Sequence, residues 1–114
     1  MPAPPPGPPD LVLALSSAAH PDIVLPRVWM GEGVRLVVEG RDAMTGDAAG
    51  LQALRFTLIR PDGLRIVAPP ALIVHGATNL AWLDWVLDQP GRWHIQARCA
   101  EPRPALDWLT IDAV

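Results

Sequence analysis

Serine, cysteine and histidine are the side chains of this sequence that could support nucleophilic catalysis, in which a base activates a nucleophile and a third group orients the base. The available residues are Ser16, Ser17, Cys99, His20, His75 and His94. None of them falls within a recognised catalytic motif, and the spacing of the three histidines matches no metal-binding pattern. We therefore expect a protein that is not an enzyme and that holds no metal and no cofactor.

Two tryptophans have side chains suited to binding a partner. Alternation along apolar segments places Trp82 and Trp108 on solvent-facing sides, where an indole can stack on a sugar ring or anchor a protein interface. Arg92, Arg98 and Asp84 could form the polar rim of such a surface. A covering loop or subunit, or a strand register slipped by one residue, would instead bury both indoles.

The first ten residues, MPAPPPGPPD, predict an extended arm. Proline fixes φ and has no amide hydrogen, so residues 1–9 can join neither a helix interior nor a sheet, and the folded domain should span residues 10–114. A polyproline arm loses little conformational entropy on docking. The candidate contacts are therefore Pro4, Pro5, Pro6, Pro8 and Pro9, although an arm that contacts nothing is the commoner case.

Length, charge and hydropathy restrict the possible partners. The 114 residues suffice for one domain, and a net charge of -3 argues against a nucleic-acid partner. The apolar run at 11–15 is too short to span a bilayer and lacks the features of a secretory signal, so we expect no membrane contact and synthesis in the cytoplasm. The mean hydropathy of +0.22 fits either an Ala- and Val-rich core or a surface covered by neighbouring subunits.

The elements that must position these residues are short strands separated by turns. Strands are predicted at 11–17 and at 33–42, followed by a loop at 43–50. The apolar run at 22–30 is interrupted by Pro26, which confines it to a sheet edge or an irregular crossing. Residues 54–68 predict a hairpin around the RPDG turn, in which Leu54, Phe56 and Leu58 face the core and Leu64, Ile66 and Ala68 return. A further strand should end at His75, and the next should place Leu83, Trp85 and Leu87 on one inward face. The last strand should place Leu109, Ile111 and Ala113 inward.

The stretch DQPGRWHIQARC, residues 88–99, predicts both a strand and a corner. One face holds Trp93, Ile95, Ala97 and Cys99, and the other holds Arg92, His94, Gln96 and Arg98. Asp88, Gly91 and Trp93 resemble the corner of immunoglobulin domains with tryptophan in place of tyrosine, and the buried indole should donate to a backbone carbonyl. About seven strands without a helical period predict an all-β, immunoglobulin-like antiparallel sandwich, with a barrel as the main competitor.

Residues 31–114 resemble a family of small accessory virion proteins of tailed bacteriophages. The resemblance is carried by GEGVRLVVEGRD, by the FTLIRPDG hairpin, by DQPGRWHIQA and by a closing strand. It implies an immunoglobulin-like structural protein, either a head decoration, a head–tail component or a tail-associated subunit. Its partners would be other virion proteins in a symmetric multi-copy assembly. The proline arm lies outside the shared pattern, and a carbohydrate- or receptor-binding module using Trp82 or Trp108 is the alternative.

Overall fold

Apolar residues that alternate with polar ones form eight strands in the computed structural model, which describes residues 11–68, 79–101 and 104–114. The strands are β1 (Leu11–Ser17), β2 (Arg27–Val28), β3 (Gly33–Asp42), β4 (Gln52–Ile59), β5 (Arg65–Ala68), β6 (Leu80–Val86), β7 (Gly91–Glu101) and β8 (Ala105–Ala113). The described residues contain no helix, so the fold is all-β, as predicted.

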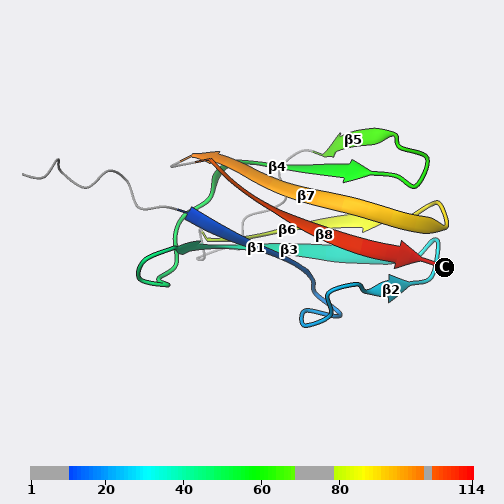
Figure 1. The fold of residues 1–114 in the computed structure, drawn as a ribbon, viewed down its shortest axis with the longest axis horizontal. Coiled ribbons are helices and arrows are strands. Elements are labelled where there is room, and N and C mark those ends of the chain that lie inside the picture. The colour runs from blue at the N-terminus through cyan, green and yellow to red at the C-terminus, as the bar shows by residue number, and fades with distance from the viewer. Residues whose placement is uncertain (1–10, 69–78, 102–103) are drawn as a thin grey trace, which may run out of the picture.

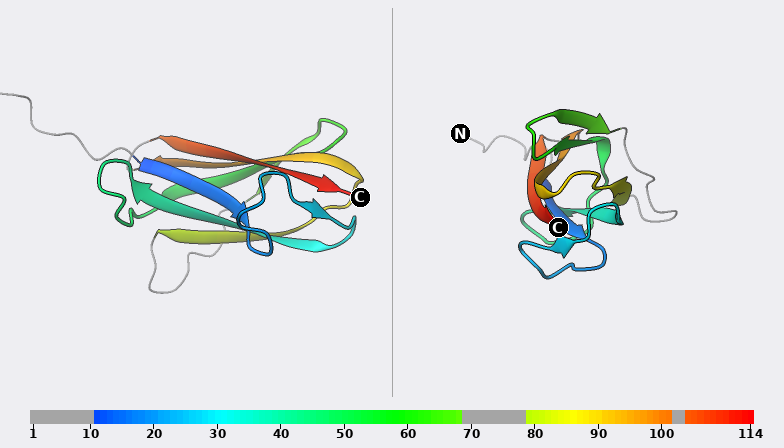
Figure 2. Two further views of the ribbon diagram at one scale, coloured as in Figure 1. Left: turned by 60° about the horizontal axis from the view of Figure 1, so that its bottom comes forward. Right: turned by 90° about the vertical axis from the view of Figure 1, so that its right-hand side faces the viewer.

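The strands form two sheets that pack on each other. One has three strands in the order β1-β3-β6, and the other has five in the order β2-β8-β7-β4-β5. Figure 1 shows the chain with its strands labelled, and the left view of Figure 2 shows β8 and β6 in the two separate layers. Side chains of both sheets meet in one core, because each strand turns alternate residues inward.

The largest fully buried side chains come from both layers. Leu36 and Val38 extend from β3, and Phe56, Leu58, Trp93, Ile95 and Ile111 extend from the five-stranded sheet. The inward sets predicted for residues 33–42, for the first hairpin strand and for residues 92–99 are confirmed, since all of these predicted core residues are buried. The faces of both sheets are therefore assigned, and the outward residues can be read from the register.

A side chain bridges the two layers where β1 lies beside β8. The backbone N–H of Leu15 donates a hydrogen bond of 2.8 Å to Oδ2 of Asp107 on β8. In an antiparallel pair, the amides along one strand point alternately toward the partner strand and away from it. The amide of Ala18 donates to the carbonyl of Arg35 on β3, so the amide of Leu15, at the opposite phase, points away from β3. The Asp107 carboxylate thus satisfies a donor that the sheet leaves unpaired.

The apolar run at 22–30 is mostly irregular. Only Arg27 and Val28 form β2, an edge strand whose place after Pro26 agrees with the prediction. β2 pairs with β8 in the parallel direction, whereas the other strand pairs are antiparallel, as predicted. The described residues contain eight strands rather than about seven. Pro26 lacks an amide hydrogen but its carbonyl accepts from Asp112, which starts this short ladder.

The hairpin at 54–68 closes through the predicted turn. The amide of Gly63 donates to the carbonyl of Arg60 at 2.9 Å, and Gly63 has a φ of 87°. This extra left-handed residue makes a three-residue loop, so the return strand begins only at Arg65. Leu64, which was expected to return toward the core, is exposed instead. The predicted strand ending at His75 and the arm at residues 1–9 lie outside the described residues.

Candidate partner-binding surfaces

Trp82 and Trp108 lie on opposite layers, so the structure does not bring them together. Trp82 is half-buried on the outer side of β6, and the guanidinium of Arg35 lies 5.0 Å from its ring centroid. Asp84 holds Arg35 in place through two hydrogen bonds of 2.8 and 3.0 Å. These bonds also lower the pKa of Asp84. A cation therefore covers one face of Trp82, which weighs against sugar stacking there.

Trp108 shares the outer side of the five-stranded sheet with Arg92 and Arg98. The register places Trp108 opposite Gln96, Leu106 opposite Arg98, and Asp112 opposite Arg92. Arg92 donates to Asp112 at 3.0 Å, and this hydrogen bond lowers the pKa of the aspartate. Three residues proposed from the sequence thus belong to one surface.

We call this outer side of β4, β5, β7 and β8 the basic face. Its charged members in the described residues are Arg55, Arg65, Arg92, Arg98 and Asp112. Its exposed apolar members are Val67, Leu106 and Trp108. A chain with a net charge of -3 therefore places four of its nine basic residues, and one aspartate, on a single sheet surface. The alternation of each strand was predictable, but the pairing of strands that joins these arginines was not.

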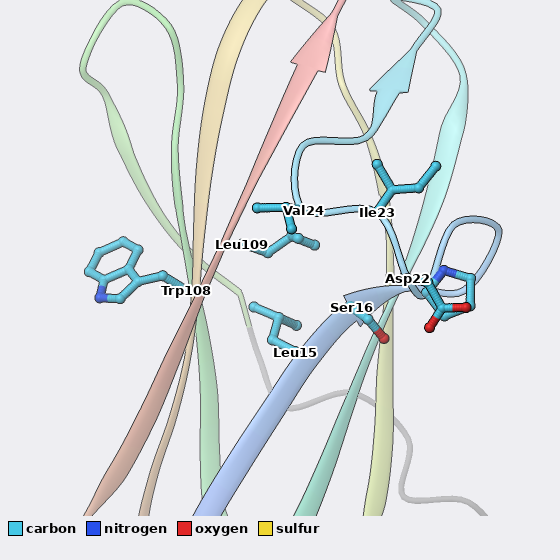
Figure 3. Close-up of a pocket in the computed structure, with 8 residues that line it drawn as sticks. Leu15, Ser16, Asp22, Ile23, Val24, Trp108 and Leu109 are labelled. Atoms are coloured by element: carbon cyan, nitrogen blue, oxygen red, sulfur yellow. The ribbon is translucent and has the colours of Figure 1, made fainter.

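A hollow of about 240 Å³ lies where β1, β8 and the segment after β1 meet (Figure 3). Leu15, Val24 and Leu109 point into it, whereas the Trp108 indole lies on the other side of β8. Val24 is 91% exposed, although it belongs to an apolar run. The hollow is lined mainly by hydrophobic groups and lacks the converging polar side chains expected of a small-molecule site.

The most exposed tryptophan is one that the sequence analysis did not select. Trp29 is 70% exposed and begins a turn in which Glu32 donates to its carbonyl at 3.0 Å. Gly31, with a φ of 89°, occupies the position of that turn that favours glycine. The available signal was the MGEG turn directly after an apolar, proline-interrupted segment.

The segment that ends in this turn is unusually apolar for a surface. The exposed large hydrophobic residues between positions 23 and 30 are Ile23, Val24, Leu25, Trp29 and Met30. Val114 lies beside them, because its carbonyl accepts from Met30 and its amide donates to Val28. Residues 23–30 together with Val114 form what we call the apolar end surface.

The residues considered for catalysis do not converge. Ser17 and Cys99 are buried, and the Cys99 thiol lies 2.8 Å from the carbonyl oxygen of Gln52. His94 lies on the basic face beside the Thr110 hydroxyl, whereas His20 lies in the turn after β1. Within residues 11–68, 79–101 and 104–114, no three histidine, cysteine or acidic residues group as metal ligands would. His75 lies outside those ranges.

No protein-family model matches this chain, and no curated protein matches its sequence. Among the described residues there is no helix long and apolar enough to cross a membrane.

Proposed function

We propose that this chain is a non-enzymatic accessory structural protein of a tailed-bacteriophage virion, made in the host cytoplasm and bound to neighbouring capsid or tail proteins. The proposal rests first on the motifs that resemble that family. It rests second on the apolar end surface, a short segment in which five large hydrophobic side chains are exposed. Exposed large hydrophobic residues concentrated in one segment favour a protein interaction site, whereas scattered single residues do not.

We also propose that the two sheets form an immunoglobulin-like sandwich. In that fold strands A, B and E face a sheet in which G, F and C are neighbours. The order β1-β3-β6 facing β8-β7-β4-β5 fits this arrangement, with β5 as the additional C′ strand. The corner also fits, because the Trp93 indole donates to the carbonyl of Gln89 just before β7, as the corner tyrosine does in immunoglobulin domains.

The apolar end surface is the single observation that carries the binding function. Tryptophan and methionine are enriched at protein interfaces, and Trp29 and Met30 are adjacent and exposed. One such contact buries little area, but many copies arranged by symmetry bind together with far higher effective affinity. A small domain can therefore attach firmly to a particle through a modest surface.

Purified particles test the proposal directly. We expect the protein to co-purify with particles at a fixed copy number, measured by quantitative mass spectrometry of gradient-purified particles. Replacing Trp29 by serine should reduce this occupancy. The matched control is Met44→Ser, which removes an even more exposed apolar side chain from the loop after β3. Recovery of the parent protein only in the lysate supernatant would contradict the proposed function.

A further inference from the structure

We propose that the basic face binds an acidic segment of a partner protein, with a carboxylate held between Arg55 and Arg98. This inference deepens the proposed function and rests on it only in taking the partner to be a protein. The two arginines are directly opposite each other across β4 and β7. Both are exposed, and neither has an ion-pair partner among the described side chains.

Two like charges opposite each other on neighbouring strands are unfavourable for the isolated domain. Other arginines on β3 and β7 form ion pairs within the domain. Arg35 pairs with Asp84, and Arg92 pairs with Asp112. Arg55 and Arg98 are thus a pair of cations without a counter-charge among the described side chains. A carboxylate placed between them would relieve their repulsion and accept charge-assisted hydrogen bonds from both.

The surface between these arginines is hollowed. Ala53, Arg55, Arg98 and Ala100 line a depression of about 360 Å³, in which the small alanine side chains leave room beside the guanidinium groups. Ala53 has a φ of 52°, a left-handed conformation that costs free energy in alanine. This backbone outlier lies beside two arginines that have no ion-pair partner among the described side chains.

The neighbouring side chains favour a protein segment over a nucleic acid. Leu106 lies opposite Arg98, and Trp108 follows two residues later on the same face. Both are about half exposed, so apolar surface borders the two cations. Arginine and tryptophan together are typical of protein-interface anchors. A long polyanion would also meet a chain whose net charge is -3, which disfavours it.

The test uses a synthetic peptide, acetyl-Gly-Glu-Leu-Glu-Leu-Glu-Gly-amide, titrated into the full chain and followed by backbone and arginine side-chain NMR shifts. We expect saturable shifts centred on Arg55 and Arg98. The same peptide with glutamine in place of glutamate should bind at least about tenfold more weakly, because its neutral amides lose the charge-assisted hydrogen bonds. Equal binding of the two peptides, or shifts located elsewhere, would overturn the proposal.

A charge reversal separates binding from folding. Arg98→Glu should weaken peptide binding by at least about tenfold while slightly raising Tm, because it converts an unfavourable pair with Arg55 into a favourable one. Arg98→Gln should also weaken binding, and Arg41→Gln, which changes an arginine on the other sheet, should leave it unchanged. Unchanged peptide binding in Arg98→Glu would count against the site.

A single-stranded oligothymidylate serves as the competing probe. Tighter binding of this oligonucleotide than of the glutamate peptide on the basic face would overturn the choice of a protein partner. The particle experiment remains independent of these results. Particle occupancy without peptide binding would refute only this inference, and peptide binding by a chain absent from particles would refute only the proposed function.

Discussion

The indole of Trp93 meets two demands at once, because a fully buried ring must fill core volume and its N–H must find an acceptor. The ring has no exposed area, and its Nε1 donates to the carbonyl oxygen of Gln89 at 3.0 Å. The acceptor lies four residues upstream, in the turn that leads into β7. One side chain therefore fixes both the core and the direction in which β7 begins.

Trp93→Phe should lower the free energy of unfolding by about 2 kcal/mol, because it loses the hydrogen bond to Gln89 and part of the buried volume. Urea unfolding followed by circular dichroism measures this change. The matched control is Trp108→Phe on the basic face, where the indole is 49% exposed and the change should stay within about 0.5 kcal/mol. Equal losses for the two variants would show that the Trp93 corner is not important for stability.

Strand β3 joins the three-stranded sheet to the loop that leads into β4. Gly40 donates to the carbonyl of Asn79 and accepts from the amide of Ala49, so its backbone is bound on two sides. A side chain at Gly40 would place a Cβ 2.7 Å from the Ala49 oxygen and 2.7 Å from a methyl of buried Leu51. The close approach of these segments therefore requires glycine.

Gly40→Ala should destabilise the protein by about 2 kcal/mol, because the loop must move away from β3. Gly33→Ala is the matched control, since it lies at the start of the same strand and its Cβ would meet no atom within 4 Å. The control should change stability by less than about 0.5 kcal/mol. Thermal unfolding by calorimetry compares the two, and a Gly40→Ala protein as stable as the control would contradict the packing argument.

The regular strands were predictable from apolar runs and from alternation. The predicted ranges for β1 and β3 coincide with the observed bounds, because residues 11–17 form a short apolar run and residues 33–42 alternate. β2 was not predictable in length or direction, because two residues carry no periodicity and their pairing depends on the distant β8. Leu64 keeps the predicted face, opposite Arg60, but it is exposed because it lies at the loop end of the hairpin, before the return strand begins at Arg65.

The candidate surfaces were only partly predictable for a related reason. Alternation correctly placed Trp108 outward, but it gave no account of which strands are neighbours. The opposition of Arg55 and Arg98 depends on the β4–β7 register, which joins residues 43 positions apart in the chain. The exposure of Trp29 was not predicted, because Trp29 begins a turn and lies outside any strand with a regular alternation.

Across the whole molecule, charge is segregated in a way that the net value conceals. The chain carries 12 acidic and nine basic residues. Four of the arginines nevertheless lie on the basic face, while the apolar end surface is on the segment before β3 and at the end of β8. A protein with two chemically different surfaces can contact two different neighbours, which suits an accessory component of an assembly.

Acid stability is a further property of the whole molecule, because carboxylates on both sheets are held in their charged form. The pKa values of Asp84 and Asp112 are lowered chiefly by hydrogen bonds from Arg35 and Arg92, and the pKa of Asp62 is lowered chiefly by the backbone amide of Leu64. In the unfolded chain these groups titrate at about pH 3.9. Their stabilisation is therefore complete above that pH and is lost as the pH falls through the lower folded values.

Asp84→Asn should consequently destabilise the protein at pH 6 and have a smaller effect at pH 2.5, where the parent carboxylate is largely protonated in the unfolded chain. Urea unfolding at the two pH values measures the difference. Asp22→Asn is the control, since this exposed carboxyl has no ion-pair partner among the described side chains, and its effect should vary less with pH. An Asp84→Asn effect that stays constant from pH 6 to pH 2.5 would mean that the Arg35 pair does not contribute to stability through its charge.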